Sequence, residues 1–278
     1  MAGMLAPIQW IARLISGATG RESWLIRQLR PAYESTLQLL SAGRGVPWEI
    51  NGVPFRIDSH YRNRMGHDYD ASVALFLSQR VKPGAICFDV GANVGVYVLQ
   101  FAHWSGSSGR VIAFEPNPAA VEVLSRHVRL NEIESTVTIE KVAISSAPGT
   151  ATLYRAQADG MSRLGEPNKL LRDRVEPIEV PVTTIDEFCA RTGLTPDWLL
   201  IDIEGFEFAA LLGATRMLER QRNKLGLVVE MHPDVWKSAA TSREGVERFL
   251  SEMGLCAIPL TGQQDSLREH GLVHLAWI

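Results

Sequence analysis

The spacing of apolar residues divides the chain into segments that predict helices and segments that predict strands. Over residues 22–41 and 68–81, apolar residues recur every three or four positions, which predicts two helices. Between these helices, alternating apolar residues flank the pair Asn51 and Gly52, the strongest short signal for a β-hairpin. The first part of the chain therefore predicts helices and a hairpin rather than a large sheet.

Beyond Pro83 and Gly84, which end the second helix, short apolar runs alternate with segments of helical periodicity. This alternation is typical of βαβ units that build a parallel sheet. We therefore expect an α/β fold, with a mostly parallel, Rossmann-like sheet and helices on both of its faces. The boundary at Pro83 divides the chain into an N-terminal helical and hairpin cap (residues 1–82) and a main domain (residues 83–278).

Part of the main domain departs from this alternation. Residues 137–145 predict a third strand, and residues 150–155 and 178–182 predict an added antiparallel pair. The connection between this pair, residues 156–177, is polar and rich in arginine, with acidic residues that balance its charge. Loops of this length inside a compact domain are often functional, so the connection is either a solvated loop or a lid over a substrate.

The stretch from residue 86 to residue 95 carries the first candidate chemistry. An apolar run ends in Asp89, and the turn that follows contains Gly91 and Gly95, which allow close backbone approach where a side chain would clash. The helix after Gly95 would direct its unpaired N–H groups into this turn, and ligands of open α/β sheets bind at the carboxyl ends of strands. The stretch predicts a site for a nucleotide-like ligand.

A second acid, Glu115, closes the next predicted strand about 20 residues beyond Gly95, where a ribose-binding carboxylate is expected. The glycine turn has the spacing G-x-x-x-G and does not match the G-x-G-x-x-G pattern of dinucleotide-binding proteins. Ribose hydroxyls would stabilise the buried carboxylate through charge-assisted hydrogen bonds of about 1.5–3 kcal/mol each. The alternative for Asp89 and Glu115 is that they accept hydrogen bonds from neighbouring backbone N–H groups.

Three carboxylates lie at or just beyond the end of the predicted strand 198–203. Side chains alternate along a strand, so Asp202 and Glu204 should share one face. Glu207 would begin the next helix, either as part of the site or as a stabiliser of the helix N-terminus. Such crowding raises the pKa of one carboxyl or recruits a cation.

The predicted strand 225–229 leads into Glu230 and His232, which should face the same crevice. Histidine is the side chain best matched to proton abstraction near neutral pH. We therefore predict His232 as the general base, with Asp202 and Glu204 as further catalytic residues. Alternatively, Asp202, Glu230 and His232 hold a divalent metal ion that polarises a substrate oxygen, and we rank the general base above the metal.

Four stretches resemble, in order and spacing, the FkbM family of S-adenosylmethionine-dependent methyltransferases: CFDVGANVGVYVLQFA, VIAFEPNP, LLIDIEGFEFAALLGA and LVVEMHP. The resemblance covers roughly residues 85–235. It implies a class I methyltransferase fold, S-adenosyl-L-methionine as cofactor, and O-methylation of a hydroxyl on a sugar, glycan or polyketide-type small molecule. One departure is Leu200, where the family commonly has lysine.

The resemblance and the strand ends together predict which residues bind the cofactor. The last residues of the third strand would contact the adenine, and the acids and glycines of the turns would contact the rest. The predicted set is Asp89, Gly91, Ala92, Asn93, Gly95, Glu115, Asn117, Ala143, Ile144 and Asp202.

Composition narrows the partners and the compartment. With 28 basic and 31 acidic residues and a formal net charge of −3, the chain lacks the basic surface that nucleic acid demands. Its three cysteines are widely spaced, which suggests neither a zinc site nor a disulfide framework and favours a reducing, cytoplasmic setting. The apolar stretch 4–15 is too short to span a bilayer. It predicts an amphipathic helix that docks on the enzyme, on a second copy in a homo-oligomer, or on a membrane surface.

Two other classes of protein compete with this interpretation. A NAD-dependent oxidoreductase would share the glycine turn and the ribose acid, but the chain lacks the Tyr-x-x-x-Lys pair of short-chain dehydrogenases. A non-catalytic cofactor-binding module would explain Leu200. The sequence does not identify the acceptor, because acceptor choice would reside in the cap and in residues 156–177, which contain no recognisable motif.

Overall fold

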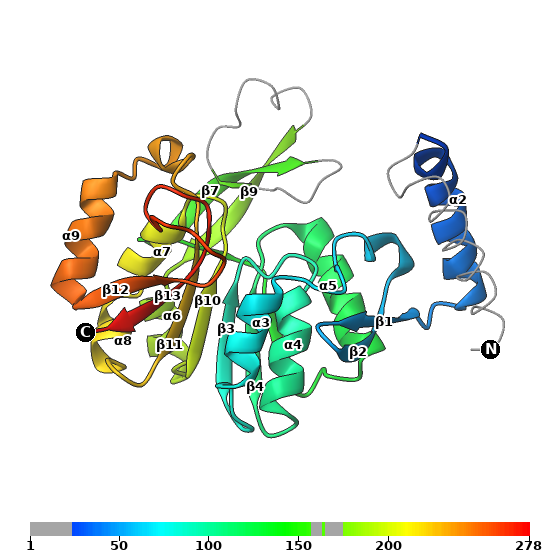
Figure 1. Ribbon diagram of the computed structural model, residues 1–278, viewed down its shortest axis with the longest axis horizontal. Coiled ribbons are helices and arrows are strands. Elements are labelled where there is room, and N and C mark those ends of the chain that lie inside the picture. The colour runs from blue at the N-terminus through cyan, green and yellow to red at the C-terminus, as the bar shows by residue number, and fades with distance from the viewer. Residues whose placement is uncertain (1–23, 157–162, 165–174) are drawn as a thin grey trace. The chain divides into compact units, whose positions relative to one another are not determined.

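The computed structural model describes residues 24–156, 163–164 and 175–278 (Figure 1). The amphipathic helix predicted for residues 4–15 lies outside these ranges. So does most of the polar connection 156–177, so the choice between a solvated loop and a lid remains a prediction.

The chain forms two compact units. The smaller one extends to Tyr69 and includes Arg129–Glu132, and the larger one comprises Asp70–Val128 and Ile133–Ile278. The division into a cap and a main domain at Pro83 remains a prediction.

The smaller unit contains the predicted helix and hairpin. Helix α2 (Trp24–Leu40) precedes strands β1 (Val46–Ile50) and β2 (Val53–Ile57), which pair antiparallel, and the short helix η1 (Ser59–Tyr61) follows. Asn51 and Gly52 both have positive φ, of 49° and 79°, as a tight two-residue hairpin turn requires. Both predictions for this region are confirmed.

The larger unit is built on a seven-stranded sheet. Its strands lie in the order β12 (Leu255–Pro259), β13 (Gly271–Trp277), β11 (Gly226–Met231), β10 (Trp198–Ile201), β3 (Ile86–Val90), β4 (Arg110–Phe114) and β5 (Val137–Glu140). All neighbouring pairs are parallel except the two that β13 forms. The mostly parallel sheet is confirmed, while β12 and β13 are strands that the sequence analysis left unassigned.

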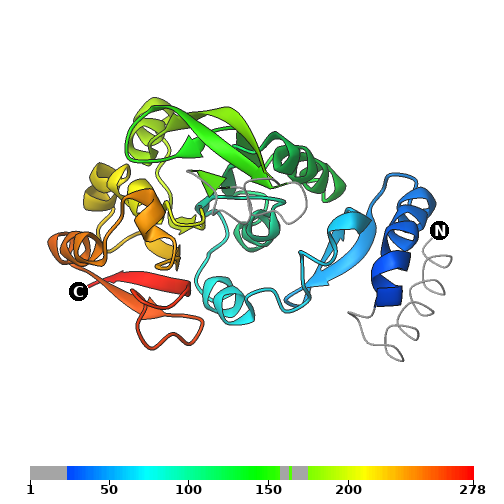
Figure 2. The same cartoon turned by 90° about the horizontal axis from the view of Figure 1, so that it is seen from above.

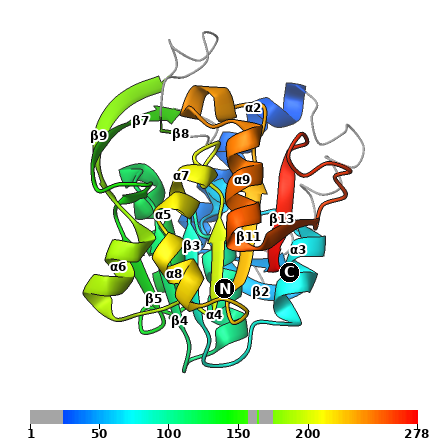
Figure 3. The same cartoon turned by 90° about the vertical axis from the view of Figure 1, so that its left-hand side faces the viewer.

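Helices cover both faces of this sheet (Figure 1). One layer consists of α3 (Ala71–Ser78), α4 (Val96–Ser105) and α5 (Pro118–Leu130). The other consists of α6 (Ile185–Thr192), α7 (Glu207–Leu212), α8 (Thr215–Arg220) and α9 (Arg243–Met253), with the short helix η3 (Trp236–Ala239) before α9, and it faces the viewer in Figure 3. Beneath it, Phe88, Phe114 and Phe188 meet edge to face, with ring centroids 4.9–5.6 Å apart. These fully buried rings fix α6 against the sheet.

A second sheet has the order β6 (Ala143–Ile144), β9 (Val175–Thr183), β7 (Gly149–Ala156) and β8 (Arg163–Leu164). The long antiparallel pair β7 and β9, green in Figure 2, confirms the predicted added pair. The prediction of one strand over residues 137–145 is wrong. The ladder with β4 ends at Glu140, and Ala143 and Ile144 instead pair with β9, which buries these two apolar side chains in the second sheet.

Candidate active site

The turn after β3 is locked against the end of β10. Gly91 has a φ of +89°, and a Cβ at this position would collide with the backbone carbonyl oxygen of Asp202. The N–H groups of Gly91 and Ala92 both donate to the carbonyl of Phe114, at 3.0 and 3.1 Å. Only glycine fits this turn, because it must adopt a left-handed conformation against the backbone of a neighbouring strand. Helix α4 follows Gly95 directly, as predicted.

Glu115 connects two turns at the carboxyl end of β4. Its Oε2 accepts from the backbone N–H of Asn93 at 2.7 Å, and its Oε1 accepts from that of Asn117 at 2.8 Å. The backbone contacts considered as the alternative are therefore present. Glu115 can still accept further hydrogen bonds, because each carboxylate oxygen has a second lone pair. Burial, only partly offset by these two hydrogen bonds, raises the pKa of Glu115 to about 7.

A pocket opens at this edge of the sheet, and Glu115 lines it. Its polar wall also includes Asn93, Asn117, Asp202 and Glu204, and its apolar wall includes Phe114, Val142, Ala143, Ile144 and Leu153. Seven of the ten predicted cofactor residues line this pocket: Gly91, Asn93, Glu115, Asn117, Ala143, Ile144 and Asp202. Asp89, Ala92 and Gly95 do not line it. Leu153, from β7, belongs to the wall although the sequence analysis did not select it.

Asp89 lies on β3, directly before Val90 of the pocket wall. It is buried, and its Oδ2 has no hydrogen-bond partner within the described part of the chain. Burial and the charge of Glu115 raise the pKa of Asp89 to about 7. In the parallel register Asp89 is opposite Leu200, which is also buried, so the neighbouring strand offers an apolar side chain at this point.

The strand predicted over residues 198–203 ends earlier than expected, at Ile201. Glu204 has a φ of 54°, a left-handed conformation that is uncommon for residues with a side chain and typical of functional sites. Asp202 and Glu204 nevertheless line the same pocket, although the strand alternation from which their shared face was predicted stops at Ile201. Burial and the charge of Glu230 raise the pKa of Asp202 well above its usual value, and burial also raises that of Glu204.

His232 follows β11 and is oriented by Glu207. The His232 Nδ1 lies 2.9 Å from Oε1 of Glu207, and both side chains are buried. The same oxygen accepts from the backbone N–H of Gly205 at 2.7 Å, which fixes the carboxylate. Glu207 therefore does more than stabilise the start of α7, because it determines which way the imidazole faces.

The remaining nitrogen of His232 faces other acids. Its Nε2 lies 3.8 Å from Oε2 of Glu204. Burial lowers the pKa of His232, but the hydrogen bond and charge of Glu207, together with the charges of Glu230 and Glu204, outweigh burial and raise this pKa to about 9.

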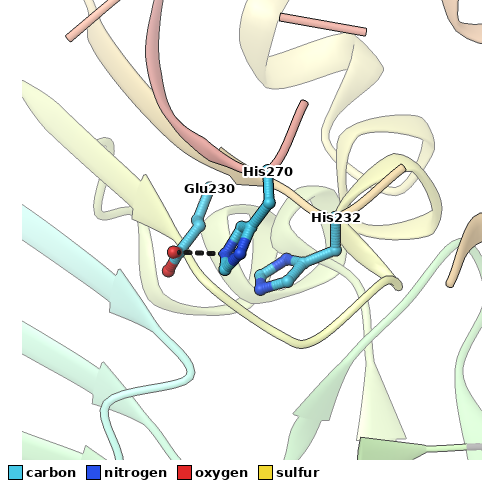
Figure 4. A group of neighbouring side chains, drawn as sticks. All are labelled: Glu230, His232 and His270. Atoms are coloured by element: carbon cyan, nitrogen blue, oxygen red, sulfur yellow. Dashed lines mark hydrogen bonds and ion pairs between the residues drawn. The ribbon is translucent and has the colours of Figure 1, made fainter. Parts of the chain in front are cut away.

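A second histidine lies against the first. The rings of His232 and His270 have centroids 4.4 Å apart and planes inclined by 31°. His270 Nε2 lies 2.8 Å from Oε1 of Glu230, and Figure 4 shows its ring between that carboxylate and His232. Glu230 and His232 were predicted to face one crevice, whereas His270 was not among the predicted site residues. The only signal for His270 was its position before an apolar run, 271–278, that predicts a strand.

Fold and site together define the class of protein. A seven-stranded sheet with one reversed strand, and an acidic pocket at the carboxyl ends of its central strands, make up the class I methyltransferase fold. The family model described as the methyltransferase FkbM domain matches residues 89–254, more than half of the chain. The chain belongs to this family.

Two curated proteins are similar over part of their length. The chain is 30% identical over 162 residues to the 31-O-demethyl-FK506 methyltransferase FkbM of Streptomyces tacrolimicus. This alignment covers 48% of the present chain and 60% of that protein. The chain is also 37% identical over 90 residues to methyltransferase sdnD of Sordaria araneosa. That alignment covers 31% of the present chain and 34% of the relative. The matched region spans less than two thirds of either relative.

Among solved structures, the methyltransferase FkbM of Methylobacillus flagellatus KT aligns with a TM-score of 0.46 and 16% identity. The alignment covers 68% of this chain and 43% of that one. Within the described ranges of the present chain, no helix combines the length and apolarity needed to cross a bilayer.

Proposed function

We propose that this chain is an S-adenosylmethionine-dependent methyltransferase that methylates a hydroxyl of a sugar, a glycan or a polyketide-type small molecule. The observation that carries the proposal is Glu115, a buried carboxylate in the pocket wall with lone pairs left for two ribose hydroxyls. Membership in the FkbM methyltransferase family supports the reaction. The name of the Streptomyces relative, which refers to a 31-O-demethyl substrate, supports oxygen as the methyl acceptor.

The two walls of the pocket suit the two ends of this cofactor. Glu115 and Asn117 would bind the ribose, and the apolar wall formed by Ala143, Ile144 and Leu153 would hold the adenine. The turn over residues 89–95 and Asp202 would hold the amino-acid end of the cofactor. Such an arrangement leaves the sulfonium methyl near Asp202 and Glu204, at the acidic side of the pocket.

Asp202, Glu204 and His232 are the side chains that we propose to act on the acceptor. The cofactor supplies the electrophilic methyl group, and the protein has to hold the acceptor oxygen in line and remove its proton. Alignment accounts for about 7–11 kcal/mol of the barrier in well-oriented reactions, and acid–base assistance for roughly 10²–10⁴-fold. The ring nitrogen of His232 that Glu207 does not engage is the atom that meets the acceptor oxygen, directly or through a cation.

Calorimetric titration tests the cofactor half of the proposal without a known acceptor. S-adenosylhomocysteine should bind the purified chain, NADH should give no signal, and Glu115→Ala or Asp89→Ala should weaken the binding. Glu140→Ala is the matched control, since Glu140 ends the adjacent strand β5 and lies outside the pocket wall. NADH binding would instead support the oxidoreductase alternative, and binding of neither ligand would overturn the family-based proposal.

A second experiment separates an enzyme from a cofactor-binding module. The chain is incubated with S-adenosylmethionine and a set of hydroxylated sugars and macrolides, and mass spectrometry follows methyl addition and S-adenosylhomocysteine release. Turnover that His232→Ala slows, with S-adenosylhomocysteine affinity unchanged, is expected. Equal turnover in the variant would remove His232 from the proposed catalytic set.

A further inference from the structure

Strand pairing brings three metal-type ligands together. Strands β11 and β13 are antiparallel, and their ladder ends with Met231 opposite Gly271. His232 and His270 are the next residues on the two segments, and Glu230 lies two positions before His232, on the same face. The backbone register alone therefore gathers Glu230, His232 and His270 side by side.

Donor atoms of these three side chains are spaced for one ion. A carboxylate oxygen of Glu230 and one ring nitrogen of each histidine all lie within 4.8 Å of one another (Figure 4). Two ligands of the same metal, with bonds of about 2.0–2.2 Å, are separated by at most roughly 4.4 Å. The side chain of His270 is 57% exposed, so a small rotation of this side chain can close the difference.

The contact between His232 and Glu207 is the kind that supports a metal ligand. Because Nδ1 donates to Glu207, Nε2 is the nitrogen free to bind an ion. A carboxylate on the non-ligating nitrogen is the usual second partner of a metal-bound histidine, and it orients the ring. Glu207 is 1% exposed, and its other oxygen, Oε2, has no hydrogen-bond partner in the part of the chain that the structure describes.

Negative charge surrounds the three ligands. Asp202 shares a hydrogen bond with Glu230, and Glu204 Oε2 lies 3.8 Å from the nearest histidine nitrogen. Asp70, at the start of α3, is close enough to Glu230 for their charges to interact. No lysine or arginine of the described segments forms an ion pair with any of these acids or with Glu207. A divalent cation would neutralise this excess.

We propose that Glu230, His232 and His270 bind a divalent transition-metal ion, such as Zn²⁺, beside the cofactor pocket. Two imidazoles and one carboxylate suit transition metals, whereas Mg²⁺ and Ca²⁺ prefer oxygen ligands throughout. Three protein ligands leave coordination positions open for a substrate oxygen. Asp202 and Glu204 both line the pocket and contact or approach this cluster, so the ion and the cofactor would be neighbours.

This inference rests on the proposed methyl transfer and supplies its activating group. The ion lowers the pKa of the acceptor hydroxyl, and the proton passes to the Glu204 carboxylate. The oxygen bonds to the methyl carbon while the carbon–sulfur bond breaks and leaves its electron pair on sulfur, giving a methyl ether and S-adenosylhomocysteine. With Nε2 as a ligand, His232 does not take the proton itself, so the ion replaces the direct base expected from the sequence.

Metal binding is tested on the full chain after chelator treatment and dialysis. ZnCl₂ and MgCl₂ are titrated by calorimetry, and CoCl₂ by visible absorption, which reports imidazole ligands. One Zn²⁺ per chain is expected, with MgCl₂ much weaker. His270→Ala and Glu230→Gln should each weaken Zn²⁺ binding at least about 100-fold, and Glu207→Gln about 10–100-fold. His103→Ala, which removes an exposed histidine of α4, should change nothing.

Binding of S-adenosylhomocysteine is measured on the same samples, and it separates the two proposals. Chains that bind S-adenosylhomocysteine but show no saturable Zn²⁺ binding would overturn the metal site and leave the methyltransferase proposal standing. Equal Zn²⁺ affinity in the original chain, His270→Ala and Glu230→Gln would also overturn the site, and Mg²⁺ binding as tight as Zn²⁺ would overturn the choice of metal. Zn²⁺ binding without S-adenosylhomocysteine binding would overturn the proposed function alone.

Discussion

The two ends of the site stabilise buried carboxylates in different ways. At the end that we propose for the cofactor, called the cofactor end, Glu115 accepts two backbone N–H groups from the turns that flank it. At the histidine end, Asp202 and Glu230 face each other, and Glu207 accepts from one backbone N–H and from the side chain of His232. Backbone donors are always present once the turns form, whereas side-chain partners depend on the tertiary fold. The first end is therefore a preformed cradle, and the second is a site whose charge is incompletely balanced.

The largest expected effect comes from the residue that joins the two ends. Gly91→Ala should lower the free energy of unfolding by about 4 kcal/mol or more, because it adds a clash with the Asp202 backbone to left-handed strain. Gly193→Ala is the control, since Gly193 also has positive φ but its Cβ would meet open space. Gly193→Ala should lower the free energy of unfolding by about 1 kcal/mol. Urea unfolding measures both, and similar losses would show that the Gly91 contact is not rigid.

Asp89→Asn should change how the free energy of unfolding depends on pH. The pKa of Asp89 in the folded state, about 7, lies above its usual value, so the folded chain keeps this proton to a higher pH than the unfolded chain. The stability therefore falls as the pH rises towards 7. The variant mimics the protonated form. Its free energy of unfolding should match that of the original chain near pH 4 and exceed it by roughly 4 kcal/mol near pH 8. Urea unfolding across this range measures the difference, and a constant difference at all pH values would contradict the burial of an unpartnered charge.

Two matched amide variants compare the ends directly. Glu115→Gln should weaken S-adenosylhomocysteine binding about 10–100-fold, since the amide cannot accept on both of its terminal atoms. Glu230→Gln should leave this affinity within about twofold. Calorimetry of both variants gives the comparison. Equal losses would mean that the two ends form one coupled site rather than two.

The smallest effect concerns left-handed backbone at each end. Glu204→Gly should raise the free energy of unfolding by about 0.5 kcal/mol, because glycine relieves the positive φ. Asn93→Gly should gain less, since asparagine tolerates this conformation and its N–H remains bonded to Glu115. Thermal unfolding of the two variants provides the measurement. A larger gain for Asn93→Gly would reverse the assignment of strain to the histidine end.

Much of the cofactor end could be predicted from the sequence because its residues follow strand ends that local patterns indicate. Glycines, apolar runs and strand-terminal acids are local signals, and the turn at Gly91 and the acid Glu115 were both placed correctly. The break after Glu140 was missed, because the charged pair Glu140 and Lys141 between two apolar runs does not by itself reveal that the chain changes sheets. Leu153 was missed for a related reason, since its strand belongs to the second sheet.

The histidine end could be predicted only in part. Asp202, Glu204 and His232 follow strands whose order the βαβ pattern suggests, and Glu230 lies near the end of one of them. His270 reaches the site only through the antiparallel register of β13, a long-range pairing with no local signature. Glu207 was considered, but the sequence left its partner unidentified, because a helix start explains an acid equally well.

The reversed strand β13 also imposes an order on assembly during synthesis. Every residue that lines the pocket precedes residue 205 in the chain, while His270 emerges from the ribosome much later. A nascent chain could therefore form the pocket that we propose for the cofactor before His270 is available. When β13 pairs with β11, His270 would join Glu230 and His232 and complete the proposed ion site. The chain could therefore bind its cofactor before it could catalyse the reaction.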